Sequence, residues 1–225
     1  MDRQSKIPKI IHYVWVGTKP LTPLAKKCIL SWKMHLPEYE FRLWNESNSP
    51  MLHHYVNKMY RKKQWAFVAD YIRFWALEKE GGVYLDTDTE VLKTFDPLLN
   101  HGAFFGQTKD GITAAGVIGA VARHPAISDM LAVYDADTEY STGRTSPRTV
   151  TNVLAAKRYD DVVVYGYQYF NPCDDGEVCS SNKLSLAYTI NHWAGSWVPF
   201  RRVRKLARRL GIVSFFKKIS DIFNI

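Results

Sequence analysis

The sequence feature that most constrains the fold is a helix that leads through two glycines into a strand ending in two carboxylates. Residues 65–80 place apolar side chains at helical spacing, and Gly81-Gly82 predicts the end of that helix. An apolar strand at 83–85 follows, and Asp86-Thr87-Asp88 comes directly after it. In α/β sheets, ligands bind beyond the carboxyl ends of the strands. The order therefore predicts that this acidic pair lies at a binding edge.

The rest of the chain also alternates between strands and helices. Apolar or alternating runs predict strands at 9–16, 39–44, 103–106, 115–121, 162–170 and 186–192. Helices are expected at 24–35, 50–58, 125–135 and 147–157. With 46% hydrophobic residues and no linker before about residue 200, residues 1–200 are expected to form one α/β domain.

The pair Asp86 and Asp88 is the first candidate for chemistry. On an extended backbone, residues two apart point their side chains the same way, and two bare carboxylates repel each other. Mg²⁺ or Mn²⁺ would offset that repulsion, since both take oxygen ligands and keep positions for phosphate oxygens. An acidic turn is the alternative, because Asp and Thr are common in turns. The helix, double glycine and buried strand before the pair favour the metal site.

Two further groups of polar residues are candidates. Asp70 and Arg73 are three residues apart on the predicted helix, so they share a face and are either functional or a structural ion pair. The segment 191–197 contains His192, which could ligate a metal or act as an acid or base, or could be a buried histidine beside core aromatics. Gly195 in the same segment would let a backbone N–H approach a phosphate.

The positive charge of the chain is concentrated at its end. The formal net charge is +8, and residues 201–225 contribute seven of those charges. Apolar residues recur there at helical spacing with Lys and Arg between them, a pattern typical of a helix that binds an anionic membrane surface. A helix packed on the body, or one that binds a protein or nucleic acid, is the alternative. The near-neutral body argues against nucleic-acid recognition.

Cysteine content and hydropathy bear on location. Cys28, Cys173 and Cys179 are too few for a disulfide framework, although a bridge between Cys173 and Cys179 stays open. The first residues lack the apolar core of a signal peptide, and no run of about 18 apolar residues occurs. The expected location is therefore the cytoplasm, at the cytoplasmic face of the inner membrane.

Several ordered blocks carry a family resemblance. They are IPKIIHYVWVG at 7–17, SW at 31–32, PEYEFRLWNE at 37–46, AFVADYIRFWALEKEGGVYLDTDTEVLK at 66–93, GVIGAVARHP at 116–125 and NHWAGSW at 191–197. With them the chain resembles glycosyltransferase family 32, the DXD-motif group that includes bacterial capsule and O-antigen transferases and yeast initiating mannosyltransferases. The resemblance implies a GT-A fold, meaning one Rossmann-like α/β domain with a mixed, mainly parallel sheet. It also implies retaining sugar transfer with Mn²⁺ or Mg²⁺.

The resemblance also implies roles for individual residues. Asp86, Asp88 and Arg73 would stabilise the charge on the departing diphosphate. Asp88 would ligate the metal directly, with Asp86 and His192 as further ligands. Trp15 would stack on the donor base, and Asp70 and Asp86 would bind ribose or sugar hydroxyls. Arg73 would hold the donor. The diphosphate would be contacted by Gly195, Ser196 and Trp197. Asn191-His192 and Ala114-Ala115-Gly116 depart from common family patterns, which leaves sugar specificity open.

The expected function is transfer of a hexose from a nucleotide-sugar donor to a glycan acceptor that is lipid-linked. UDP-hexose is favoured over GDP-mannose, and capsule, O-antigen or exopolysaccharide synthesis is the expected role. The alternatives are a nucleotide-sugar hydrolase, a nucleotidyltransferase, or a non-enzymatic basic protein that binds membrane or nucleic acid. Gly17-Thr18-Lys19-Pro20 is a poor match to the glycine-rich loop of a nucleotidyltransferase.

Overall fold

The computed structural model of the protein describes residues 7–140, 143 and 145–195. The chain divides into two units, residues 1–193 and residues 194–225. The predicted membrane helix at 201–225, together with Ser196 and Trp197, lies outside the described residues. The first unit carries the α/β fold.

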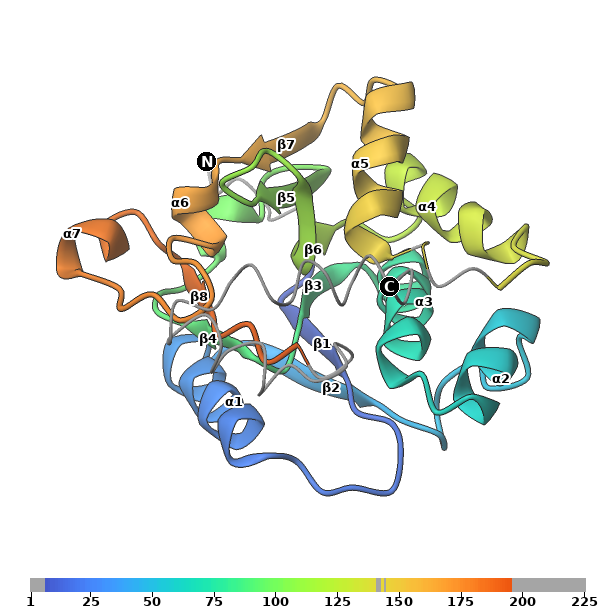
Figure 1. The fold of residues 1–225 in the computed structure, drawn as a ribbon. Helices are drawn as coiled ribbons and strands as arrows, with labels where there is room; N and C mark the ends of the chain where they lie inside the picture. The colour runs from blue at the N-terminus through green and yellow to red at the C-terminus, as the bar shows by residue number, and fades with distance from the viewer. Residues whose placement is uncertain (1–6, 141–142, 144, 196–225) are drawn as a thin grey trace, which may run out of the picture. The chain divides into compact units, whose positions relative to one another are not determined.

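A six-stranded mixed sheet forms the middle of the first unit (Figure 1). Its order is β2 (Glu40–Trp44), β1 (Ile10–Val14), β3 (Gly82–Leu85), β6 (Thr113–Ala120), β5 (Ala103–Gln107) and β7 (Val162–Tyr165). Only β6 runs antiparallel to its neighbours in this sheet. The predicted mixed, mainly parallel sheet is confirmed, and the carboxyl ends of β1, β2 and β3 meet at one edge.

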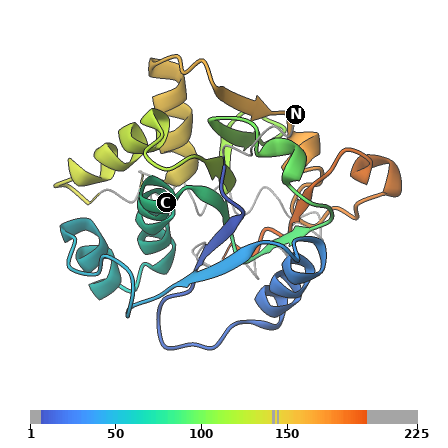
Figure 2. The same ribbon diagram turned by 180° about the vertical axis from the view of Figure 1, so that it is seen from behind.

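Helices cover both faces of the sheet (Figures 1 and 2). One apolar core joins the sheet to α2 (His54–Arg61), α3 (Trp65–Glu80), α4 (Pro125–Asp135) and α5 (Ser146–Ala156). The other core joins it to α1 (Pro23–His35), β4 (Thr89–Val91), the 3₁₀ turn η1 (Asp96–Leu98) and α6 (Tyr167–Phe170). Strand β4 pairs antiparallel with β8 (Thr189–Asn191), and α7 (Ser181–Leu184) lies in the loop before β8. Alternating strand residues feed the two cores, as pleating requires.

The junction between α3 and β3 depends on its two glycines. Gly81 has φ +65° and Gly82 has φ +108°, a backbone region that side chains other than hydrogen disfavour. A Cβ would lie 2.6 Å from the Ala122 backbone nitrogen at Gly81, and 2.6 Å from the Ile10 carbonyl oxygen at Gly82. The predicted end of the helix is therefore confirmed, and the glycines also allow β3 to insert tightly beside β1.

Some predicted elements differ from the structure. The strand predicted over 162–170 is wrong beyond Tyr165, because Gly166 turns the chain and α6 follows. The aromatic run in α6 suits a strand by composition, but packing decides it: Phe170 is buried against Gly106, where a Cβ would lie 2.5 Å from its ring. Strand β4 was not predicted, and β8 covers only the last part of the strand predicted at 186–192.

Candidate active site

The D-x-D segment lies where β3 leaves the sheet. The Asp86 N–H donates to the Gly116 carbonyl over 2.8 Å, and the Thr89 N–H donates to the Asp86 carbonyl over 3.0 Å. The second bond closes a tight turn that leads into β4. The expectation of an extended backbone through the motif is therefore wrong, since the chain must turn there to change sheets. The acidic pair still lies at the predicted sheet edge.

Arg73 reaches from α3 to the base of this turn. Its side chain is 5% exposed, with Nη2 2.8 Å from Asp70 Oδ1 and 3.4 Å from Asp86 Oδ1. Its Nη1 donates to the Ala115 carbonyl over 2.5 Å, and the guanidinium lies 4.6 Å from the centre of the Tyr84 ring. One buried cation therefore links α3 to both β3 and β6 at the point where Asp86 emerges.

Asp70 is buried below that cation. It is 6% exposed, and its two carboxylate oxygens accept from the Arg73 guanidinium, the Ser146 hydroxyl at 2.7 Å and the Ser146 N–H at 3.0 Å. Asp70 thus ties α3 to the start of α5. This geometry matches the structural ion pair that the spacing left open, and its oxygens contact protein groups rather than an open surface.

The electrostatics of the cluster keep Arg73 charged and Tyr84 protonated beside Asp86. Burial lowers the pKa of Arg73, but Asp86, Tyr84 and Asp70 raise it by more, so the guanidinium stays charged. Burial raises the pKa of Tyr84 well above its usual range, so its hydroxyl stays protonated and donates to Asp86 Oδ1 over 2.9 Å. Asp86 itself is one-third exposed. Arg73 and Tyr84 contact its Oδ1, while its Oδ2 lies on the side of Gly116.

Asp88 and His192 meet across the small sheet of β4 and β8. The His192 N–H donates to the Asp88 carbonyl over 2.9 Å, which extends by one residue the pairing of Thr89 with Asn191. Directly opposed residues in an antiparallel pair share a face, so the two predicted metal ligands start from the same face. The fold thus brings together residues more than one hundred positions apart.

Glu90 is a residue that sequence reasoning missed. It lies on the same face as Asp88, two positions along β4, and its Oε2 is 2.7 Å from His192 Nε2 and 2.8 Å from Lys27 Nζ. These contacts lower the pKa of Glu90 despite the opposing effect of burial. Its spacing from Asp88 was the available signal, once β4 is recognised as a strand.

Gly116 and Asn191 form a small cradle beside Asp86. A Cβ placed on Gly116 would lie 3.0 Å from Asp86 Oδ2 and 3.6 Å from Asn191 Nδ2. Glycine therefore leaves a space, lined by a carboxylate and an amide, that a side chain would fill. Asn191 is a second residue to which sequence reasoning gave no role, although Asn191-His192 stood out as a departure from common family patterns.

The donor groups at this edge fit Mg²⁺ or Mn²⁺. Such ions are usually held by one or two protein carboxylates and take their other ligands from phosphates and water. Within residues 7–140, 143 and 145–195, no three His, Cys, Asp or Glu side chains gather into a complete metal-binding group. Asp86 and Asp88 lie on one turn beside the space at Gly116. They could therefore supply two ligands to a divalent ion whose other ligands come from a bound diphosphate. The Nε2 atom of His192 is engaged by Glu90, so its predicted ligation needs Nδ1 or an exchange of partners.

Trp15 follows β1, at the edge where β3 also ends. It is half-buried, its N–H donates to the Trp44 carbonyl, and its indole N–H donates to the Lys19 carbonyl over 2.8 Å. Glu46 accepts a hydrogen bond from the Gly17 N–H over 2.6 Å, which restrains the loop after β1. This loop is positioned to border the same edge as the D-x-D turn. Gly195, with φ +51°, belongs to the second unit.

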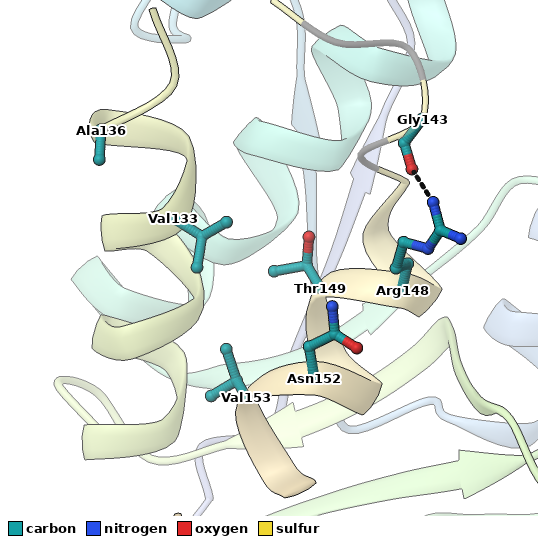
Figure 3. A pocket seen from close by; sticks show the side chains of 7 residues that line it. All are labelled: Val133, Ala136, Gly143, Arg148, Thr149, Asn152 and Val153. Atoms are coloured by element: carbon teal, nitrogen blue, oxygen red, sulfur yellow. Dashed lines mark hydrogen bonds between the residues drawn. The ribbon is translucent and has the colours of Figure 1, made fainter. Parts of the chain in front are cut away.

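Two pockets lie apart from this set of residues. One, of about 550 Å³, opens between α4 and α5 (Figure 3) and is lined by Val133, Ala136, Gly143, Arg148, Thr149, Asn152 and Val153. The other, of about 330 Å³, is lined by Lys109, Tyr167, Gln168, Pro172 and Lys183. None of the predicted site residues lines either pocket.

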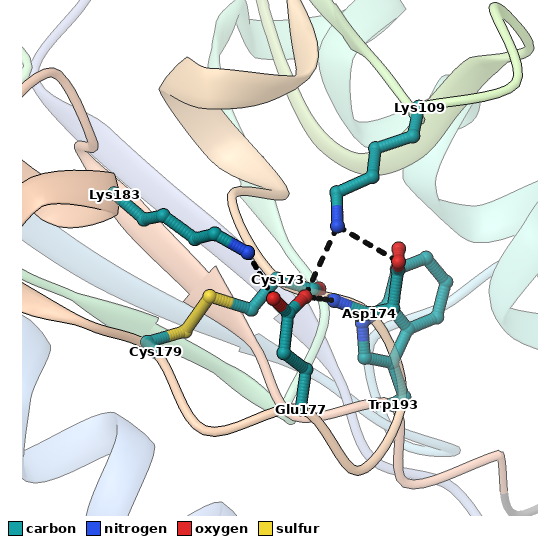
Figure 4. Close-up of polar contacts among 7 residues, drawn as sticks. All are labelled: Lys109, Cys173, Asp174, Glu177, Cys179, Lys183 and Trp193. Carbon is teal, nitrogen blue, oxygen red and sulfur yellow. Dashed lines mark hydrogen bonds and ion pairs between the residues drawn. A yellow bond between two sulfur atoms is a disulfide. The ribbon is translucent and has the colours of Figure 1, made fainter.

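The structure also answers the open question about the cysteines. Cys173 and Cys179 form a disulfide (Figure 4). Cys28 is buried as a free thiol. Among the described residues, no helix has the length and hydrophobicity needed to span a bilayer.

Comparison with known proteins places the D-x-D turn in a family context. Residues 23–105 match the family described as the glycosyltransferase sugar-binding region containing the DXD motif. This part of the chain is therefore similar to the sugar-binding region of the DXD glycosyltransferases. This match includes Asp70, Arg73, Asp86 and Asp88, and it confirms the predicted family resemblance.

A curated relative is similar over about half of the chain. Inositol phosphoceramide mannosyltransferase 3 of Schizosaccharomyces pombe (strain 972) is 30% identical over 136 residues, which are 55% of this chain and 36% of that protein. The chain matches only about a third of the length of each of the curated relatives.

Solved glycosyltransferase structures share the fold. The PaToxG glycosyltransferase superposes with a TM-score of 0.54 at 19% identity, over 67% of this chain and 69% of the other. A glycosyltransferase involved in glycosylating the major capsid of PBCV-1 gives a TM-score of 0.53 at 15% identity, over 83% and 95%. The predicted GT-A-type α/β fold is thus confirmed.

Proposed function

We propose that the chain is a metal-dependent, retaining glycosyltransferase that takes a hexose from a nucleotide-sugar donor. The observation that carries the proposal is the D-x-D turn itself, at the carboxyl edge of a GT-A sheet and within the matched sugar-binding region. The buried Arg73 below it and the open space at Gly116 beside it support the same assignment. A non-enzymatic basic binding protein would need neither feature.

In this proposal Asp86 and Asp88 hold Mn²⁺ or Mg²⁺, and His192 is the further candidate ligand. When bound, the ion supplies Lewis-acid stabilisation of the negative charge that builds on the departing diphosphate. Arg73 and Tyr84 hold Asp86 in place, so little reorganisation is needed when that charge develops. Trp15 is proposed to stack on the donor base. Gly195, Ser196 and Trp197 are proposed to contact the diphosphate.

The names of the relatives bear on the substrates. The curated relatives are mannosyltransferases or synthases of mannosylated inositol phosphoceramide, which favours GDP-mannose as donor and a lipid-linked acceptor with a polar head group. UDP-hexose, the donor favoured by the sequence analysis, becomes the second candidate. The role in capsule, O-antigen or exopolysaccharide synthesis stays a prediction.

A lipid-linked acceptor would also explain the basic segment at 201–225, which we propose binds an anionic membrane surface. The predicted cytoplasmic location stays a prediction. The disulfide favours an oxidising compartment instead, because disulfides persist there and are rare in the cytosol.

The experiment that tests the proposal is a thermal-shift screen of nucleotide sugars with Mn²⁺, followed by product analysis. Donor binding stabilises the folded state by mass action, by about 2.7 kcal/mol at one hundred times the dissociation constant. The expected result is a shift with GDP-mannose or a UDP-hexose that chelation with EDTA abolishes, and transfer of sugar to an acceptor glycolipid. Release of free sugar alone would indicate a hydrolase, and pyrophosphate exchange would indicate a nucleotidyltransferase.

A further inference from the structure

Trp193 has an unusual backbone for a large aromatic residue. Its φ is +49°, in the left-handed region that residues other than glycine, Asn and Asp seldom adopt. Such conformations persist where the surroundings hold them, and they concentrate at functional sites. The contacts that hold Trp193 therefore indicate what the strained residue positions.

Two hydrogen bonds fix this residue. Its backbone N–H donates to Asn191 Oδ1 over 2.8 Å, and its indole N–H donates to the Cys173 carbonyl over 3.0 Å. The first bond orients the Asn191 amide, since an amide that accepts through its oxygen directs its NH₂ the other way. That NH₂ group borders the cradle at Gly116, beside Asp86 Oδ2. Trp193 thus connects the D-x-D edge to the loop that begins at Cys173.

That loop is closed by the Cys173–Cys179 disulfide (Figure 4). The intervening residues carry charged contacts: Lys109 lies 2.8 Å from Asp174 and 3.0 Å from Glu177, and Lys183 also pairs with Glu177. These groups are largely or partly exposed, and exposed ion pairs contribute little to stability. The covalent bridge is therefore the main constraint on the loop that presents the Cys173 carbonyl to Trp193.

We propose that Trp193 is a positioning residue for the donor site, which orients the Asn191 amide beside Asp86 and is itself held by the Cys173–Cys179 loop. The inference rests on the proposed function, because Asn191 borders the proposed donor-binding edge. The ligand of the Asn191 NH₂ group would be an oxygen of the nucleotide sugar, either a sugar hydroxyl or a phosphate oxygen. The disulfide then makes donor affinity sensitive to thiols.

The test uses the full chain, with and without dithiothreitol. Two electrons and two protons from this dithiol convert the Cys173–Cys179 bridge to two thiols, and the dithiol closes to a cyclic disulfide. Reduction, Trp193→Phe and Asn191→Ala should each raise the donor KM roughly tenfold, the scale of one lost hydrogen bond, with kcat changed far less. Trp75→Phe is the matched control, because Trp75 packs on Trp44 and takes no part in the contacts between Asn191, Trp193 and Cys173. The donor KM of this variant should not change. The Cys173→Ala/Cys179→Ala variant should show the raised KM without further response to dithiothreitol.

A second readout works without turnover. In protein labelled with 5-fluorotryptophan, the ¹⁹F resonance that Trp193→Phe removes should shift on reduction, while the other tryptophan resonances stay in place. An unmoved resonance, or an unchanged KM in active protein after both reduction and Trp193→Phe, would overturn the inference. If the unmodified protein binds and turns over no nucleotide sugar, the proposed function fails instead, and the resonance still reports whether the loop holds Trp193.

Discussion

Asp70→Asn is the substitution whose cost the structure defines most closely. The oxygen Oδ1 accepts from both Arg73 and the Ser146 hydroxyl, while Oδ2 accepts from the Ser146 N–H. Asparagine keeps one acceptor oxygen but places an NH₂ group against either the Arg73 guanidinium or the Ser146 N–H. Whichever way the amide turns, a buried donor faces another donor.

The magnitude follows from those lost contacts. A hydrogen bond to a charged group contributes about 1.5–3 kcal/mol, and a buried donor left unsatisfied costs about 1–3 kcal/mol. Since part of the Arg73 contact survives through Asp86, we expect unfolding free energy to fall by about 2–4 kcal/mol. For a domain of this size, that corresponds to a melting temperature lower by roughly 5–15 °C.

The assay is urea and thermal unfolding followed by circular dichroism. Asp160→Asn is the matched control, because Asp160 pairs with Arg158 at the surface, where both side chains are about 90% exposed. This exposed pair should show little change. If Asp70→Asn were as stable as the control, the buried ion pair would not hold α3, β3 and α5 together, and the account of Asp86 positioning would be wrong.

Three further predictions address the fold and the site. Burial lowers the pKa of His12, whose Nε2–H donates to the Gly81 carbonyl and whose Nδ1 accepts from the Trp44 indole N–H. The free energy of unfolding should therefore fall as pH drops below the unfolded-state pKa of about 6.5. Urea titrations at pH 7.5 and 5.5 should show this loss in the wild type and a smaller one in His12→Gln. Gly82→Ala should lose at least about 1–3 kcal/mol in the same unfolding assay, and more than Gly111→Ala, which has positive φ but no atom within 4 Å of the new Cβ. Gly116→Ala should leave the melting temperature nearly unchanged. It should raise the donor KM by about 10- to 10²-fold in initial-rate kinetics, because the alanine Cβ displaces Asp86 Oδ2. An unchanged KM would show that the donor does not use the cradle.

The elements that sequence predicts well are those whose signals are local. The helix at 65–80 and its glycine stop are found because the apolar spacing and the backbone demand at Gly81 both act within a few residues. The strand at 83–85 and the carboxylates after it follow for the same reason. The aromatic segment at 167–170 was misread because burial of Phe170 against Gly106, a contact distant in sequence, decides its conformation.

For the candidate site, sequence singles out the acidic residues but not the groups that contact them. Asp86 and Asp88 stand out by motif, whereas Glu90 and Asn191 gain meaning only when β4 and β8 pair across one hundred residues. Spacing could propose that Asp70 and Arg73 interact, but it could not distinguish a ligand contact from a buried support. The contacts of this pair with Ser146 in α5 and Ala115 in β6 join segments distant in sequence, so spacing could not reveal them.

The most direct test of the central claim is calorimetric titration of the full chain with a nucleoside diphosphate, with Mn²⁺ present or removed by EDTA. The wild-type protein should bind the diphosphate only with the ion, and the folded Asp86→Asn/Asp88→Asn variant should lose that binding and at least about 10²-fold in sugar transfer. Equal binding and turnover by the variant, or by the wild type in EDTA, would contradict the assignment of a divalent ion to this turn.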